Sequence, residues 1–67
     1  GAVKALRNGL LLVKGNVESI KVYDLSGRQV FAAGNASGIV DTKLGNGLYV
    51  VTYVDAEGQN VASKVRF

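Results

Sequence analysis

Nine glycines divide this chain of 67 residues into short apolar segments, at spacings of roughly eight to twelve residues, which is typical of all-β proteins. No window sustains the 3.6-residue periodicity of an amphipathic helix. The segments are rich in Val, Ile, Tyr and Phe, which favour the pleated, half-buried surface of a sheet. The pattern therefore predicts an all-β sandwich of about seven short strands. These strands are expected at residues 2–7, 10–14, 19–24, 28–33, 39–42, 48–55 and 60–67.

Three turns are predicted by their residue types. Asn8 and Gly9 lie between two strand-like runs, and Asn-Gly is the preferred pair of a type I′ hairpin because both residues tolerate positive φ. Residues 24–27 and 55–58 both have the pattern Asp-x-x-Gly. The Asp can accept backbone N–H bonds at the first position, and the Gly can take the left-handed position at the end. We therefore predict two similar hairpins, each with a type I turn and a Gly bulge.

Alternation along the strands predicts which side chains face the core. Residues 48–54 are apolar on both faces, so we predict a central strand. Its tyrosine face, with Tyr49 and Tyr53, needs cover from a loop, from the N-terminal hairpin or from a partner. The last strand, residues 60–67, is expected to be a sheet edge that can accept another strand. In the flanking strands the expected core-facing residues are Ile20, Val22, Val61, Val65 and Phe67.

The polar segment 35–38 breaks the apolar pattern, and we expect a loop there, where the chain crosses between two sheets. Its Asn-Ala-Ser triplet matches a glycosylation acceptor, but a flexible loop is the simpler interpretation. Asp41 is considered as a Ca²⁺ ligand, yet no Asp-x-Asp-x-Asp-Gly loop accompanies it. A strand-end Asp that bonds local amides explains Asp41 better.

The chain contains no Cys, His, Met, Trp or Pro. Without Cys there are no disulfides and no thiol nucleophiles, and without His the commonest general base and metal ligand are missing. The serines therefore have no histidine base beside them. We predict that the protein is not an enzyme and that it holds no cofactor and no metal.

Eight Lys and Arg against five Asp and Glu give a net charge of +3, which raises nucleic acid as a partner. Tyr23, Tyr49 and Tyr53 have the side chains that stack on bases in small β-barrels. The cations are nevertheless spread over almost every predicted strand with acids between them, so a solvated surface is the simpler interpretation. The Gly-Asn-Gly at residues 45–47 precedes a strand, not the helix that would hold a phosphate, so it predicts a tight turn. We predict no nucleic-acid partner.

The length allows one domain, residues 1–67. The chain begins at Gly1 without an initiator Met or a signal segment, so we expect a piece of a longer protein. A core of this size without a staple supplies only about 3–5 kcal/mol. We therefore expect marginal stability and an edge-strand dimer at high concentration.

Residues 20–30, Ile-Lys-Val-Tyr-Asp-Leu-Ser-Gly-Arg-Gln-Val, closely resemble the signature of the C-terminal sorting domains of type IX secretion, also called Por secretion system domains. The resemblance covers residues 10–67, and it departs at Phe67, where many members end in Lys. Further matches follow the family's order: a short apolar strand ending in Gly at 10–15, Ile-Val-Asp at 39–41, Leu-Gly-Asn-Gly-Leu-Tyr-Val-Val at 44–51, and Lys-Val at 64–65.

The resemblance implies an Ig-like antiparallel β-sandwich at the C-terminus of a protein exported by a Gram-negative bacterium. Such a domain directs its N-terminal cargo from the periplasm through the outer-membrane secretion translocon. A sortase-like surface protease usually removes the domain and anchors the cargo at the cell surface. The residues that match the family's motifs, and are candidates for recognition by the translocon, are Tyr23, Asp24, Gly27, Arg28, Gly47, Tyr49, Lys64 and Val65.

We expect the translocon to contact the turn at residues 24–28 together with the terminal strand edge. Simpler interpretations exist for single candidates: turn geometry for Gly27, packing for Tyr49 and a solvated edge charge for Arg28. Two other functions stay open. The chain can be an Ig-like or fibronectin-like accessory or adhesion module of a surface protein, or a small nucleic-acid-binding barrel.

Overall fold

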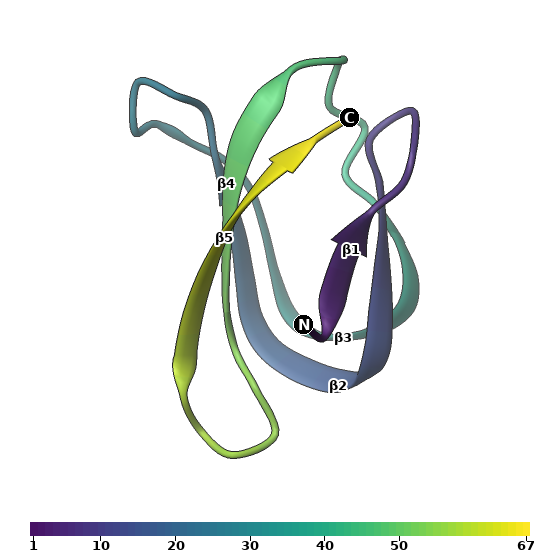
Figure 1. Cartoon of the computed structure of the whole chain (residues 1–67), viewed down its shortest axis with the longest axis vertical. Coiled ribbons are helices and arrows are strands. Elements are labelled where there is room, and N and C mark those ends of the chain that lie inside the picture. Colours follow the sequence, from purple (N-terminus) through teal and green to yellow (C-terminus); the bar gives the residue numbers. More distant parts are fainter.

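The computed structural model describes all residues, 1–67, and shows an all-β chain of five antiparallel strands (Figure 1). The strands are β1 (Val3–Ala5), β2 (Leu10–Tyr23), β3 (Gln29–Asp41), β4 (Leu48–Val54) and β5 (Asn60–Arg66). β2 pairs with β3 along one edge, and with β1 and then β4 along the other, while β5 pairs with β4. The single sheet therefore curls around its own core. No helix of the length and apolarity needed to cross a membrane is present.

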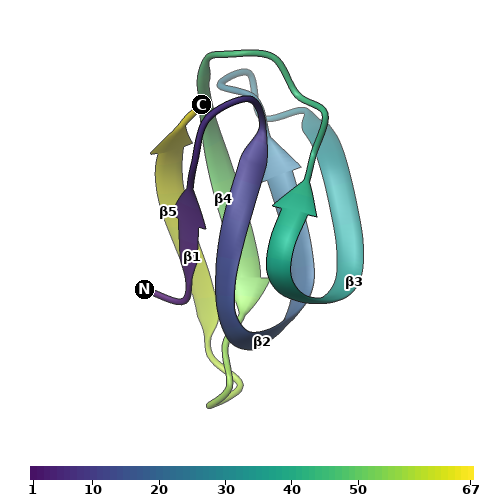
Figure 2. The same ribbon diagram turned by 90° about the vertical axis from the view of Figure 1, so that its right-hand side faces the viewer.

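The prediction of seven strands is wrong because two pairs of predicted strands are continuous. Residues 10–14 and 19–24 both fall in β2, apart from Asp24, and residues 28–33 and 39–42 fall largely in β3. The predicted crossing loop at 35–38 is also wrong, since these residues lie within β3 and pair with β2. Figure 2 shows that β2 and β3 bend back at the end opposite the C-terminus, so each contributes to both sides of the curl. The predicted first strand shortens to β1.

Residues with positive φ produce these bends. Gly15 in β2 and Gly38 in β3 both have φ of 68°, and the register of the two strands shifts beside them. Ser19 has φ of 56°, at the point where β2 changes register against β4. Each irregularity adds residues to one strand and increases its bend, as β-bulges do. The bulge at Ser19 explains why Val17 and Ile20 are both buried although they are three positions apart.

The core lies inside the curl, and the tyrosine face of β4 belongs to it. Val51 and Tyr53 are buried, and Tyr49 packs against them. Ala2, Val3 and Ala5 pack against the core cluster to which Val51 and Tyr53 belong, so the N-terminal hairpin contributes to covering the core. The position of β4 between β2 and β5 confirms a central strand. The expected core residues Ile20, Val22 and Val65 are buried, and Val61 and Phe67 pack against them half-buried.

The first hairpin has the predicted turn. Asn8 and Gly9 have φ of 58° and 76°, and the N–H of Leu10 donates to the carbonyl of Arg7 at 3.1 Å. Positive φ at both central residues is what a type I′ turn requires. Gly9 of this hairpin is buried against residues 42–44, whereas Arg7 and Asn8 are exposed.

Candidate functional site

Most of the segments that carry the resemblance reach one end of the molecule, whereas residues 10–15 run from this end to the bend of β2 at the other. At the first end, called the turn end below, Figures 1 and 2 place the β1–β2 hairpin, the β2–β3 turn, the β3–β4 connection and the C-terminus. The strand register brings the motif residues side by side: Tyr23 lies opposite Val50, and Val50 lies opposite Lys64. Tyr23 and Val50, which are 27 positions apart in the sequence, and Val50 and Lys64, which are 14 apart, are therefore neighbours in the sheet.

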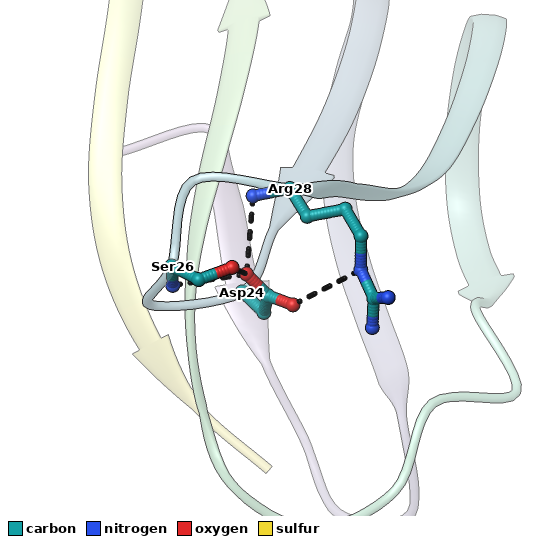
Figure 3. A network of polar contacts seen from close by, with 3 residues as sticks. All are labelled: Asp24, Ser26 and Arg28. Atoms are coloured by element: carbon teal, nitrogen blue, oxygen red, sulfur yellow. Dashed lines mark hydrogen bonds and ion pairs between the residues drawn. The ribbon is translucent and has the colours of Figure 1, made fainter.

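Asp24 organises the β2–β3 turn (Figure 3). Its Oδ1 accepts hydrogen bonds from the backbone N–H of Ser26 at 3.0 Å, from the Ser26 hydroxyl at 2.6 Å and from the backbone N–H of Arg28 at 3.1 Å. Its Oδ2 lies 3.4 Å from Nε of Arg28. The N–H of Gly27 donates to the Asp24 carbonyl at 3.0 Å, and Gly27 has φ of 90°. This is the predicted type I turn with a Gly bulge.

The same contacts stabilise the ionised carboxylate. The Ser26 hydroxyl above all, followed by the backbone N–H of Arg28, holds the pKa of Asp24 below its ordinary value. The Arg28 guanidinium adds a smaller lowering. Hydrogen bonds to the charged form favour that form, so the turn presents a fixed carboxylate that is partly screened by its own neighbours.

The second Asp-x-x-Gly turn, between β4 and β5, has the same backbone. Oδ1 of Asp55 accepts the N–H of Glu57 and of Gln59, both at 2.9 Å, and Gly58 has φ of 77°. The predicted similarity of the two hairpins is therefore confirmed. Two features distinguish the β2–β3 turn, namely the serine hydroxyl and the arginine that follows the Gly. Turn geometry explains the Asp and the Gly in both places, but it does not require an arginine.

Tyr49 connects the β3–β4 connection to the last strand. Its hydroxyl donates to the carbonyl of Gly45 at 2.9 Å, and its ring centroid lies 5.4 Å from that of Phe67 at an interplanar angle of 48°. Gly47 and Phe67 exchange two backbone hydrogen bonds, of 3.3 and 3.0 Å. Gly47 has φ of 155°, a conformation that favours glycine. The Gly-x-Gly-x-Tyr pattern therefore fixes a tight turn, as predicted, and seats the C-terminal residue.

The eight candidate residues separate into three groups: two face the core, three face outward and three shape the backbone of the turn end. Val65 is only 8% exposed and belongs to the core, and Tyr49 also faces inward. Arg28 and Lys64 are exposed, with 77% of the Arg28 side chain accessible, and Tyr23 is half-buried on the outer face of β2. Asp24, Gly27 and Gly47 shape the backbone of the turn end. The outward group, together with the Asp24 carboxylate, whose side chain is 26% exposed, can contact a partner through side chains while the domain is folded.

Charge is unevenly distributed along the molecule. Of the eight Lys and Arg, Arg7, Arg28 and Lys43 lie in the loops of the turn end and Arg66 lies beside the C-terminus. At the opposite end the β4–β5 turn carries Asp55 and Glu57. Two carboxylates, Asp24 and Asp41, also lie at the turn end, so its four cations leave an excess of two positive charges (four minus two), whereas the β4–β5 turn carries acids alone.

Thr42 is a residue of this end that sequence reasoning missed. It is 6% exposed, and its side chain joins the β1–β2 hairpin to the β3–β4 connection. The signal in the sequence is weak, because a threonine after a strand commonly bonds a local amide. Asp41 does bond locally, accepting the N–H of Lys43 at 2.9 Å. No group of three or more His, Cys, Asp or Glu side chains comes together in the structure.

No protein-family model matches the chain, and neither the curated proteins nor the solved structures yield a significant match.

Proposed function

We propose that this chain is a C-terminal sorting domain that directs an exported protein through the type IX secretion system across the outer membrane. In this proposal the curled sheet is a small Ig-like sandwich, and the domain acts by recognition, without catalysis or a cofactor. Its partners are the translocon, a sortase-like surface protease and the cargo of the same precursor. The domain passes through the periplasm and reaches the cell surface.

The observation that supports this function best is the convergence of the motif segments on the turn end. The resemblance is spread over residues 20–30, 44–51 and 64–65. Because these segments include parts of adjacent strands, they can form one surface, which supports a shared function. A shared binding surface needs this convergence, whereas a chance match of short motifs does not. The outward residues Tyr23, Arg28 and Lys64 are the ones we assign to contact with the translocon.

The basic character of the turn end defines the partner further. Four cations and two carboxylates, Asp24 and Asp41, lie at or beside its loops, which leaves an excess of two positive charges. Complementary charge accelerates association and selects among partners. We assign an acidic surface to the part of the translocon that contacts this end. Contact of this kind weakens as the ionic strength rises, because salt screens exposed charges.

The test joins these 67 residues to the C-terminus of a fluorescent passenger that carries a signal peptide. The fusion is expressed in bacteria with a working type IX translocon and in a matched strain without it. A passenger that lacks the domain reports background. Surface delivery that needs both the domain and the translocon supports the proposal. Retention in the periplasm of both strains contradicts it and favours an Ig-like or fibronectin-like accessory module instead.

A further inference from the structure

The sheet has three edge strands, β1, β3 and β5, and they differ in how well they are protected against pairing with a strand of another chain. β1 has only three residues, and β5 carries the outward cations Lys64 and Arg66. Short length and charged side chains are two of the usual devices that prevent an edge from pairing with another chain. β1 and β5 also lie close to each other. Both edges on this side are therefore protected.

The third edge belongs to β3, which pairs only with β2 although it is 13 residues long. From Gln29 to Val40 it contains no Lys, Arg, Asp, Glu or Pro. Its side chains include exposed Ile39, at 57%, one of two exposed large apolar residues in the chain. A long edge without charge or proline presents free backbone N–H and C=O groups to any strand that fits.

The part of β3 before its bend, residues 29–35, is the best pairing surface. It belongs to the widest part of the sheet, where β3, β2, β4 and β5 follow one another. From Phe31 to Asn35 its register against β2 is regular. Phe31 and Ala33 are half-buried at the border of the core, so a strand added here would also cover apolar surface.

We propose that residues 29–35 of β3 pair antiparallel with the same residues of a second copy of the chain. The two four-strand regions then form one continuous sheet around a two-fold axis, which is the commonest symmetry of homodimers. Like charges set opposite each other destabilise a strand pair, and the whole chain carries +3. Of the three edges, β3 is the one through which two identical copies can pair without bringing their cations together.

This inference does not depend on the proposed function, because it concerns a different surface and a different partner. It also specifies the expected edge-strand dimer, for which the sequence does not indicate the edge. The structure assigns the contact to the β3 edge of the sheet.

One row of the sheet supplies a matched pair of variants. Ala32 on β3 lies opposite Lys21, Lys21 opposite Thr52, and Thr52 opposite Ala62 on β5. Ala32 and Ala62 are both exposed. In the monomer, Ala32→Glu places a carboxylate beside Lys21, which favours the folded state. In the dimer, the variant brings the introduced carboxylates of the two copies close to each other, and this weakens the pairing. Ala62→Glu makes the same change at the other edge.

Sedimentation velocity of the isolated chain is measured from about 10 μM to about 1 mM, a range that covers weak association. We expect a monomer–dimer equilibrium for the wild type. Ala32→Glu should weaken the dimer about tenfold or more, and Ala62→Glu should change it less than about twofold. A wild type that stays monomeric throughout overturns the inference. So does a dimer that Ala62→Glu weakens as much as Ala32→Glu.

Hydrogen exchange of the wild type provides a readout that does not need a folded variant. Amides in residues 29–35 should become more protected as the protein concentration rises, while amides of β5 should not change. Increased protection in β5, or in neither strand, contradicts pairing through β3.

Discussion

The side-chain hydroxyl of Thr42 donates a hydrogen bond of 2.7 Å to the carbonyl oxygen of Gly9, a residue 33 positions earlier in the chain. The backbone N–H of Thr42 donates to the same oxygen at 2.9 Å. The hydroxyl oxygen in turn accepts the N–H of Leu44 at 3.2 Å. Thr42 is 6% exposed, so these bonds are formed away from water. The two hydrogen bonds from Thr42 to the Gly9 carbonyl fix the β1–β2 hairpin to the β3–β4 connection and so help to determine the shape of the turn end.

Thr42→Val should lower the free energy of unfolding by about 1–3 kcal/mol, because the half-buried N–H of Leu44 loses its acceptor and the Gly9 carbonyl loses one donor. Valine keeps the shape of the side chain, so the loss reports the hydroxyl. The control is Thr52→Val on the outer face of β4, a half-buried position, where we expect a change within about 0.5 kcal/mol. Urea unfolding followed by circular dichroism measures both. If the two variants lost the same free energy of unfolding, the hydrogen bonds of the Thr42 hydroxyl would not contribute to stability beyond what an outer-face threonine contributes.

Gly9→Ala should be much more damaging than Gly15→Ala. Both glycines have positive φ, of 76° and 68°, so both variants carry a backbone cost of about 1–2 kcal/mol. A Cβ on Gly9 would also lie 2.7 Å from the carbonyl oxygen of Leu44, whereas a Cβ on Gly15 would have open space. We expect Gly9→Ala to cost at least about 2 kcal/mol more than Gly15→Ala. Similar unfolding midpoints for the two variants would contradict the close packing at the hairpin tip.

The stability of the domain should depend on the ionisation of Asp24. Its pKa is lower in the folded state than its ordinary value, so the carboxylate stabilises the fold above about pH 4, and this contribution disappears as the pH falls through the folded-state pKa. Asp24→Asn should therefore be less stable than wild type at neutral pH. The difference in the free energy of unfolding between the two proteins should become smaller as the pH falls towards about 2.

Ser26→Ala tests the cause of that shift, since the Ser26 hydroxyl is its largest source. The variant should reduce the pH dependence of stability without abolishing the turn, because the backbone N–H bonds to Asp24 remain. Thermal unfolding at several pH values gives the comparison. A pH dependence equal to that of wild type would mean that the hydroxyl is not what stabilises the carboxylate.

Tyr49 and Phe67 should show coupled effects on stability. Their rings lie 5.4 Å apart at their centroids, and aromatic pairs of this kind contribute about 0.5–1.5 kcal/mol beyond the area they bury. A double-mutant cycle with Tyr49→Leu and Phe67→Leu should recover a coupling of that size. Tyr49→Phe keeps the ring and removes only the bond to Gly45, so it should cost about 0.5–1 kcal/mol. Additive effects in the cycle would rule out direct ring contact.

The turns could be predicted from the sequence because their chemistry is local. The positive φ of Asn8 and Gly9, and the carboxylate bonds of Asp24 and Asp55, depend on a few consecutive residues. The alternation of Ile20 and Val22 was informative for the same reason.

Contacts between distant residues could not be predicted in this way. Gly15 and Gly38 interrupt the apolar pattern as loop residues do, and only the pairing of β2 with β3 shows that they bend continuous strands. The bond between Thr42 and Gly9 joins two segments whose approach is set by the curl of the sheet, so neither residue carries a pattern that reveals its partner. The asymmetry of charge likewise depends on which loops share an end of the molecule.

The claim that the turn end is what the translocon contacts is tested most directly by two substitutions in the passenger fusion, Gly27→Val and Gly58→Val. Both glycines have positive φ, of 90° and 77°, and neither has an atom within 4 Å of an added Cβ, so a β-branched residue imposes the same kind of strain on two similar turns. Matched unfolding midpoints establish that the damage to folding is equal. The account predicts that Gly27→Val abolishes translocon-dependent surface delivery while Gly58→Val keeps it. Equal delivery by the two folded variants would contradict it.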